Sequence, residues 1–376
     1  MSGVTVWTFF SKDTAMQAHL DIRFLTLLLP VYAIYVMSPS MTIALSLMTV
    51  LSLATLVFTT VKRMRLPTAC RTVVITGCDS GFGNALARKL DQTGFTVFAC
   101  CLFVNEPGAR QLEKESSSRL RTLQLDVTSD ADVQSCLQYV AKHCGTNGLW
   151  ALVNNAGVIV YGDVELCSVE LYKSVCDVNL FGLIRMTKAF LPLVRRAHGR
   201  VVNVTSVRGL VAIPCYSVYA ITKFGIEAFS DSLRLEVRPF GVKVIVVEPG
   251  LYGGATGILN EFNKERLQRT ITKLAEKASP EVKAAYGEDR LFRLLERNIR
   301  GTSHQNQTMD PVIEVMEDAV TLKYPPQRTL VAGSSRIMDI DCLLARMRPY
   351  LPTFVTDILV EYFNGIPISR SSYKSN

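Results

Sequence analysis

A tyrosine and a lysine four residues apart, Tyr219 and Lys223, have the clearest catalytic potential in this 376-residue chain. If their segment is helical, the two side chains share one face and the ammonium lies beside the phenol. A free tyrosine has a pKa of about 10, and a neighbouring positive charge favours its phenolate. Such a phenol can take the proton of an alcohol as hydride leaves its carbon, or return it in the reverse reaction.

Two further polar residues precede this pair, in an order that makes accidental agreement improbable. Ser206 follows a predicted strand, and its hydroxyl can hold the substrate oxygen beside the phenol. Asn179 lies on the intervening helical segment and is expected to position a water that returns protons to Lys223. Lys223 can also bond a nicotinamide ribose. Together the residues predict hydride transfer between a secondary alcohol and a nicotinamide dinucleotide.

A glycine-rich loop, TGCDSGFG at 76–83, stands between a predicted strand at 72–76 and a predicted helix at 83–93. Glycines at such a place let the backbone turn tightly and approach a pyrophosphate, which the N–H groups of the helix N-terminus then bind. The residues expected to contact the cofactor in this loop are Gly77, Asp79, Ser80, Gly81, Phe82 and Gly83.

The charges around this loop favour NAD over NADP. The loop carries Asp79 and no basic residue, and the second predicted strand ends in Cys100-Cys101-Leu102, which offers no cation. A 2′-phosphate needs an arginine or lysine, and a carboxylate close to it is repulsive.

Two later turns are expected to complete the cofactor site. Asp126 and Val127 follow the third predicted strand, where they can meet the adenine; the alternative is that Asp126 caps the next helix. The small turn Asn155-Ala156-Gly157 follows the fourth strand and permits close approach of the cofactor, unless it is a simple turn.

Apolar runs alternate with amphipathic stretches from residue 71 onward. The predicted strands are 72–76, 96–100, 121–125, 151–153, 201–204, 243–247 and 329–331. This alternation predicts an α/β fold with a doubly wound parallel sheet. We expect a catalytic domain at 67–335, substrate-lid helices inserted at 251–326 and a C-terminal tail at 336–376.

Residues 1–66 are predicted to be a membrane anchor. No charged residue occurs between Arg23 and Lys62, and the run 41–61 is long enough to span a bilayer as a helix. The run 24–37 is short for a span, so one and two spans both remain open. The basic residues Lys62, Arg63 and Arg65 follow this run, and basic residues that flank a span tend to stay cytoplasmic, so we expect the catalytic domain to face the cytosol. The expected membrane is the endoplasmic reticulum, and the alternative is a mitochondrial membrane.

Composition removes several other function classes. The ten cysteines show no metal-ligand spacing, so we expect no metal site and reduced thiols. The net charge is +8, but the sequence has no run of five like charges, so nucleic-acid binding has no support beyond that surplus. The expected partners are a small alcohol or ketone and membrane lipid. The oligomeric state stays open between a monomer and a homo-oligomer.

The ordered set of glycine loop, NNAG turn, Asn179, Ser206, Tyr219 and Lys223 resembles the short-chain dehydrogenase/reductase family over residues 70–335. The resemblance implies a Rossmann-type sheet, a nicotinamide cofactor, and a turn at Pro249-Gly250 beside it. The motif TGCDSGFG resembles that of the family branch that contains retinol, hydroxysteroid and 3-hydroxybutyrate dehydrogenases. RMTKAFLPLVRRAHGRVVNV is most similar to the D-3-hydroxybutyrate enzymes, whereas GLWALVNNAG and the N-terminal anchor resemble type 2 hydroxysteroid dehydrogenases.

The substrate prediction depends on the stretch between Ser206 and Tyr219. Its only charged residue is Arg208, which would bind the carboxylate of a hydroxy acid and is otherwise expected on the surface. Residues 209–215 read as an apolar wall, which favours a lipophilic secondary alcohol of the hydroxysteroid or retinoid type. The alternatives are a D-3-hydroxybutyrate dehydrogenase and, in another class, a catalytically silent membrane scaffold.

Overall fold

A computed structural model describes residues 39–256, 261–287, 289–301, 308–333 and 339–364 of the chain. The chain divides into two compact units, which are considered separately. The first comprises Met1–Arg65 with Leu322–Tyr324, and the second comprises Leu66–Thr321 with Pro325–Asn376.

The first unit contains helix α2 (Pro39–Lys62), which includes the predicted membrane run 41–61. Its apolar side chains are exposed, with Ile43, Leu47 and Leu51 at 65%, 66% and 68%. The other predicted run, 24–37, lies outside the described residues. Among the described residues, no helix meets both the length and the apolarity required to cross a bilayer.

The second unit is built on a seven-stranded sheet in the order β3-β2-β1-β4-β5-β6-β7, with every neighbouring pair parallel. The strands are β1 (Thr72–Thr76), β2 (Thr96–Cys101), β3 (Leu120–Gln124), β4 (Ala151–Asn154), β5 (Arg200–Val204), β6 (Lys243–Pro249) and β7 (Arg328–Val331). Each predicted strand is present, with ends that differ by no more than two residues. The predicted doubly wound α/β fold is therefore confirmed.

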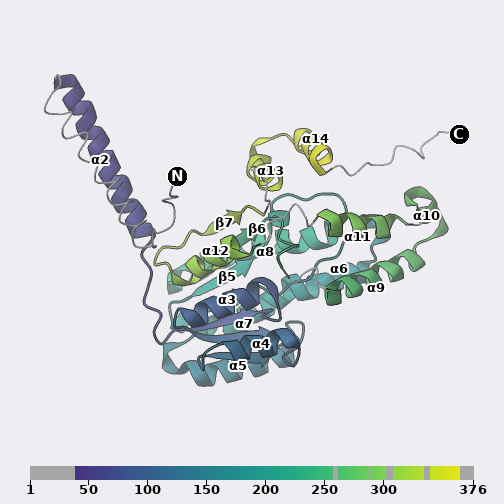
Figure 1. The fold of residues 1–376 in the computed structure, drawn as a ribbon, viewed down its shortest axis with the longest axis horizontal. Coiled ribbons are helices and arrows are strands. Elements are labelled where there is room, and N and C mark those ends of the chain that lie inside the picture. Colours follow the sequence, from purple (N-terminus) through teal and green to yellow (C-terminus); the bar gives the residue numbers. More distant parts are fainter. Residues whose placement is uncertain (1–38, 257–260, 288, 302–307, 334–338, 365–376) are drawn as a thin grey trace, which may run out of the picture. The chain divides into compact units, whose positions relative to one another are not determined.

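Helices cover both faces of the sheet, which explains why the strands read as continuous apolar runs (Figure 1). On one face, α3 (Gly81–Gln92), α4 (Pro107–Glu115) and α12 (Asp310–Thr321) join a buried core with the strands. On the other, α5 (Asp130–Cys144), α7 (Gly182–Arg196) and α8 (Ser217–Val237) form the second core. Within the predicted lid, α12 is thus a core helix: Val312, Met316 and Val320 are fully buried.

A third apolar cluster lies among helices outside the sheet layers. It joins α9 (Glu261–Lys277), α10 (Pro280–Tyr286) and α11 (Arg290–Gly301) to α6 (Val169–Cys176) and to the start of α8. Leu267, Ile271 and Leu294 supply buried side chains to it. The lid function of α9–α11 remains a prediction, but these helices do have a buried apolar face toward the start of α8.

The predicted C-terminal tail also contains helices, α13 (Ile340–Met347) and α14 (Thr353–Asn364). Cys342, Leu344 and Val360 from these helices pack against Val207 and Val211, which follow β5. The segment after the last strand is therefore packed beside the loop that carries Ser206.

Candidate active site

The loops after β1, β4, β5 and β6 line one cleft at the carboxyl ends of the strands. The strand order reverses between β1 and β4, and ligands of open α/β sheets bind at such a reversal. The cleft is lined by Phe82, Asn155, Gly157, Ile159, Tyr161, Val204, Thr205, Ser206, Arg208, Tyr216, Tyr219, Lys223, Pro249, Gly250, Leu251, Tyr252, Gly253, Thr256 and Asn298. The three principal catalytic candidates are therefore in one place.

Helix α8 positions Tyr219 and Lys223. It begins at Ser217, so Tyr219 lies in its first turn and Lys223 one turn later, on the helix that the four-residue spacing requires. Both are buried, at 8% and 4% exposure. The Lys223 ammonium lies 5.5 Å from the ring centroid of Tyr219 and donates to the carbonyl of Val204 at 3.0 Å. The carbonyl holds the lysine beside the phenol.

Burial shifts the pKa of both groups. Desolvation raises the pKa of Tyr219 to about 12, while a hydrogen bond to Ser206 and the positive charge of Arg208 oppose the rise. Desolvation lowers the pKa of Lys223 to about 8, and the Glu227 carboxylate opposes that fall. In the protein alone at neutral pH, the phenol is therefore protonated and the lysine is mostly charged.

Asn179 lies in a π-helical turn, Asp177–Phe181, between α6 and α7. Its Oδ1 accepts from the Val158 N–H at 2.8 Å, and its Nδ2 donates to Val158 O at 2.9 Å and to Thr222 Oγ1 at 3.1 Å. A Cβ at Gly157 would lie 3.4 Å from Asn179 Oδ1 and 3.8 Å from Lys223 Nζ, so Gly157 separates the two side chains. The predicted water between them stays a prediction.

The glycine loop is held in close contact with the turn after β4. Gly77 has a φ of +70°, and a Cβ there would lie 2.8 Å from Ala156 Cα. A Cβ on Gly83 would lie 2.4 Å from Gly77 O and 2.6 Å from Asn155 Nδ2. Asn155 in turn donates to Thr76 O and Gly77 O at 2.9 and 3.1 Å. No side chain larger than hydrogen fits at either glycine without movement of the backbone.

The N-terminus of α3 fits the pyrophosphate of a dinucleotide. Ser80 is its N-cap but makes no side-chain capping bond, and the first turn, from Gly81, contains no acidic residue. Backbone N–H groups that no side chain caps, at the positive end of the helix, are a ready anion site. Phe82 lines the cleft next to this terminus and packs edge-on against Tyr252 at 5.6 Å.

Asp79 belongs to the loop after β1, but its carboxylate reaches the end of β2. There its two oxygens accept from the N–H groups of Leu102 and Phe103 at 3.0 and 2.8 Å. Asp126 accepts from both the N–H and the hydroxyl of Thr128 at 2.8 Å. The alternative that Asp126 caps the following helix is wrong, since Ser129 is the N-cap of α5. Val127 is mostly buried in the core, and the adenine contact remains a prediction for this pair.

Two expectations about the substrate side are wrong. Arg208 is not a surface residue: it is 2% exposed, and Asp341 of α13 binds its Nη1 and Nη2 at 3.0 and 2.9 Å. The stretch 209–215 does not form the apolar wall of the cleft, because Val211 and Ile213 pack against α13 and α14 instead. The apolar lining comes from Ile159, Val204 and Leu251, and from several aromatic rings.

Three cleft residues had no recognisable signal in the sequence. Tyr161 and Tyr216 pack edge-to-face, with ring centroids 5.0 Å apart. The Tyr216 hydroxyl donates to Asn298 Oδ1 at 2.5 Å, across 82 residues of sequence. Because their partners are distant in the chain, no local pattern marks these residues.

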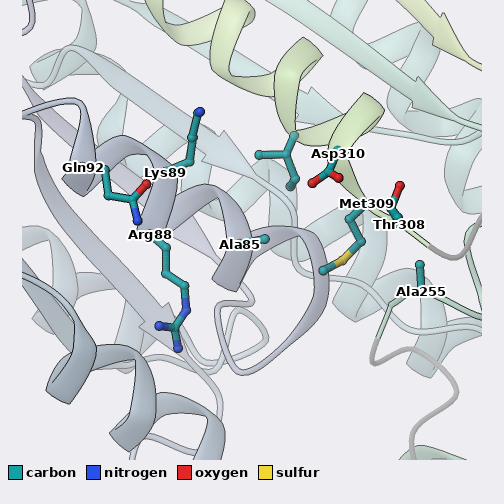
Figure 2. Close-up of a pocket in the computed structure, with 9 residues that line it drawn as sticks. Ala85, Arg88, Lys89, Gln92, Ala255, Thr308, Met309 and Asp310 are labelled. Carbon is teal, nitrogen blue, oxygen red and sulfur yellow. The ribbon is translucent and has the colours of Figure 1, made fainter. Parts of the chain in front are cut away.

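A second, more open depression lies between α3 and the start of α12 (Figure 2). Arg88 and Lys89 line it, and they pair with Glu115 and Glu317, respectively. It contains none of the predicted catalytic or cofactor residues.

Comparison with known proteins matches the short chain dehydrogenase family model to residues 71–267. The chain is 42% identical to retinol dehydrogenase 7 of Mus musculus, over 78% of this chain and 88% of that protein. It is 44% identical to the mitochondrial D-beta-hydroxybutyrate dehydrogenase of Bos taurus, over 70% and 77%. It is 39% identical to the 11-beta-hydroxysteroid dehydrogenase type 2 of Ovis aries, over 71% and 62%.

These relatives confirm the branch that the sequence resembled. They also confirm an oxidoreductase that acts on CH–OH groups with a nicotinamide cofactor. The cleft is lined by Phe82 of the glycine loop and by the serine, tyrosine and lysine at which such chemistry was expected. On the family match and these identities, the chain is a member of the short-chain dehydrogenase family.

Proposed function

We propose that this protein is a membrane-attached, NAD-dependent dehydrogenase of a lipophilic, uncharged secondary alcohol. The observation that carries the proposal is the shared cleft of Ser206, Tyr219 and Lys223, in which the one further cation among the described lining residues, Arg208, is already paired with Asp341. The grouping of these three side chains supports alcohol oxidation, and the charge that a hydroxy acid needs is compensated by Asp341.

The chemistry follows from the positions of the three side chains. Ser206 holds the substrate oxygen, Tyr219 takes the hydroxyl proton, and the Lys223 ammonium stabilises the resulting phenolate. A bound nicotinamide supplies the hydride acceptor, or the hydride in reduction. In the reduction direction the protonated Tyr219 is the proton donor, and the burial that raises its pKa to about 12 keeps it protonated.

The substrate side supports a hydroxysteroid or retinoid-type alcohol more than 3-hydroxybutyrate. Ile159, Val204 and Leu251 give the cleft apolar contacts. A substrate carboxylate near Arg208 would also lie near Asp341, and such like-charge proximity is unfavourable. The 3-hydroxybutyrate alternative keeps its support from the similarity to the bovine enzyme.

The preference for NAD rests on Asp79. Its carboxylate lies where β2 ends, the position at which Rossmann-type sheets bind the adenosine ribose. A 2′-phosphate at this place would be repelled by the carboxylate.

Membrane attachment rests on α2. The exposed apolar side chains of this helix are followed by Lys62, Arg63 and Arg65, an arrangement that keeps the flanking domain cytosolic. Protease treatment of sealed microsomes should degrade the catalytic domain. Protection of that domain would contradict the cytosolic orientation, and release of the protein by alkaline carbonate would contradict the anchor.

A substrate screen on the purified full chain tests the function, with NAD and NADP side by side. We expect NADH formation with a hydroxysteroid or a retinol. NADH formation with 3-hydroxybutyrate alone would replace the lipophilic substrate with the acid. If no alcohol reacts, and Tyr219→Phe leaves every cellular phenotype unchanged, the silent scaffold becomes the better interpretation.

A further inference from the structure

The hydroxyl of Ser206 is held by the backbone of Arg208. Ser206 is the N-cap of a short helical turn, Val207–Gly209, between β5 and α8. Its Oγ accepts a hydrogen bond from the N–H of Arg208 at 3.2 Å. The hydroxyl also contacts the carbonyl of Pro249 at 3.4 Å, which is long for an O–H···O bond. The place of the serine hydroxyl therefore depends on where the turn holds the Arg208 N–H.

The side chain of Arg208 is in turn fixed by a helix more than a hundred residues later in the sequence. Its Nη1 and Nη2 donate to the two oxygens of Asp341 at 3.0 and 2.9 Å, and both side chains are largely buried, at 3% and 15% exposure. Two such bonds between a guanidinium and a carboxylate fix orientation as well as distance. Asp341 is thus connected to the Ser206 hydroxyl through a single residue.

Helix α13, which carries Asp341, is itself held on both sides of this residue. Before it, Asp339 caps the helix and accepts from the N–H of Gly333, just after β7, at 2.7 Å. After it, Arg348 donates to the carbonyl of Leu210 at 2.7 Å. Buried apolar side chains of α13 also pack against the loop after β5. The Asp341 carboxylate therefore has a fixed position relative to that loop.

Stability alone does not account for an ion pair at this place. The cost of removing both charges from water offsets most of their attraction, and an apolar pair of similar volume is often equally stable. The ion pair adds a fixed direction for the Arg208 side chain, next to the residue that is expected to hold the substrate oxygen. Position matters there, because displacement of a catalytic group by about 1 Å can slow a reaction about 100-fold.

We propose that Asp341 is a positioning residue for the reaction: through Arg208 it sets the place of the Ser206 hydroxyl. The inference rests on the proposed dehydrogenase function, in which this hydroxyl holds the substrate oxygen beside Tyr219. It makes α13 necessary for full catalysis, although none of its described residues lines the cleft.

The test is a double-mutant cycle on the full chain, in which Asp341→Asn is introduced both into the original protein and into Ser206→Ala. In Asp341→Asn an amide NH2 group replaces one acceptor oxygen, so the two-bond contact with Arg208 is lost. We expect kcat with NAD to fall at least about tenfold when Ser206 is present, and to change less than about twofold in Ser206→Ala.

The substrate is whichever of androsterone, all-trans-retinol and 3-hydroxybutyrate the full chain oxidises fastest. Rates are compared at the optimum pH of each variant, so that the change of charge near Tyr219 does not enter. They are expressed per site titrated with NADH, so that a smaller folded fraction does not enter either. A purely structural role of Asp341 would then slow the proteins with and without Ser206 equally.

Asp163→Asn is the matched control. Asp163 makes a similar two-bond contact with Arg290, at 2.8 and 3.0 Å and with 13% and 20% side-chain exposure, but neither is among the described residues that line the cleft. This change should alter kcat by the same factor with and without Ser206. If Asp341→Asn does not fold, Arg208→Met with Asp341→Asn replaces it, because this double change leaves no buried charge unpaired. It should give the same non-additive result.

The outcomes that would overturn the proposal are distinguishable. Equal losses with and without Ser206, or an unchanged kcat in Asp341→Asn, remove the positioning role and leave the dehydrogenase function intact. A Ser206→Ala protein with the original kcat overturns the inference through its premise, the role of Ser206. A full chain that oxidises none of the three alcohols with either cofactor overturns this inference and the proposed function together.

Discussion

The cofactor side and the substrate side of the cleft are organised in different ways. On the cofactor side, glycines at 77 and 83 allow one stretch of backbone to approach another, and Asn155 holds the two loops together. On the other side of the cleft, the lining is held by side-chain pairs: Tyr216 with Asn298, and Arg208 with Asp341, 133 residues away. The cofactor side depends on small residues in short sequence motifs. The substrate side depends on contacts between segments that are distant in the sequence.

This difference separates what is common to such enzymes from what distinguishes this one. A dinucleotide presents the same phosphates to every enzyme, so the backbone geometry that binds it can be written as a local pattern. A substrate is recognised by the shape and polarity of a pocket assembled from several elements. Variants on the two sides should therefore fail differently: cofactor-side changes alter cofactor binding or choice, and substrate-side changes alter discrimination among alcohols.

The largest effect should come from Tyr219→Phe, a change at the junction of the two sides. Loss of the phenolic proton carrier should reduce kcat by about 10³-fold, near the middle of the range for acid–base groups. Cofactor affinity, measured by fluorescence titration with NADH, should stay within about threefold of the original. A variant that keeps more than a tenth of the original kcat would remove Tyr219 from the chemistry.

The second effect tests the cofactor side. In Gly83→Ala the new Cβ would lie 2.4 Å from Gly77 O, so the loop must shift and NAD binding should weaken about a hundredfold. Gly145→Ala is the control: a Cβ there meets nothing within 4 Å, although this glycine, unlike Gly83, has a positive φ of +56°. It should lower the melting temperature slightly and leave NAD affinity unchanged. Equal losses in both variants would indicate general destabilisation.

Asp79→Asn should change cofactor choice without changing substrate choice. Removal of the negative charge at the end of β2 should raise the ratio of kcat/KM for NADP over NAD about tenfold. Asp130→Asn, at a carboxylate that is 87% exposed on α5, should leave the ratio unchanged. An Asp79 variant with an unaltered ratio would place the determinant of NAD preference elsewhere.

The smallest effect should come from Glu227→Gln, one turn beyond Lys223 on α8. Glu227 raises the pKa of Lys223 against the lowering by burial, so its neutralisation should move that pKa further below about 8. A lysine that loses its proton at lower pH stabilises the Tyr219 phenolate less. The half-maximal point of the oxidation rate should therefore move to higher pH, by less than about one unit.

Rates at the optimum pH should change less than tenfold in this variant. Glu236→Gln, at an exposed carboxylate of the same helix, provides the matched control with an unshifted profile. A move to lower pH in Glu227→Gln would contradict the assigned direction of the electrostatic effect.

The fold and the catalytic set were largely predictable because each depends on short-range patterns. The five inner strands are buried on both faces and are therefore mostly apolar, and the ends of all seven strands lie within two residues of their predicted positions. The wrong predictions concern contacts with distant segments. The apolar stretch 209–215 predicts a pocket wall, but apolar residues after a strand can face either a ligand or a packing helix. The packing of Val211 and Ile213 against α13 and α14 shows the second.

The sequence by itself determined the parallel α/β sheet, the glycine loop and the order of serine, tyrosine and lysine, because backbone sterics and helical spacing act over a few residues. Only the tertiary structure decided that Arg208 is buried and paired with Asp341, that α12 belongs to the core, and that Tyr216 meets Asn298. Those contacts join residues tens to more than a hundred positions apart, and the free energy that selects them is the packing of whole helices against the sheet.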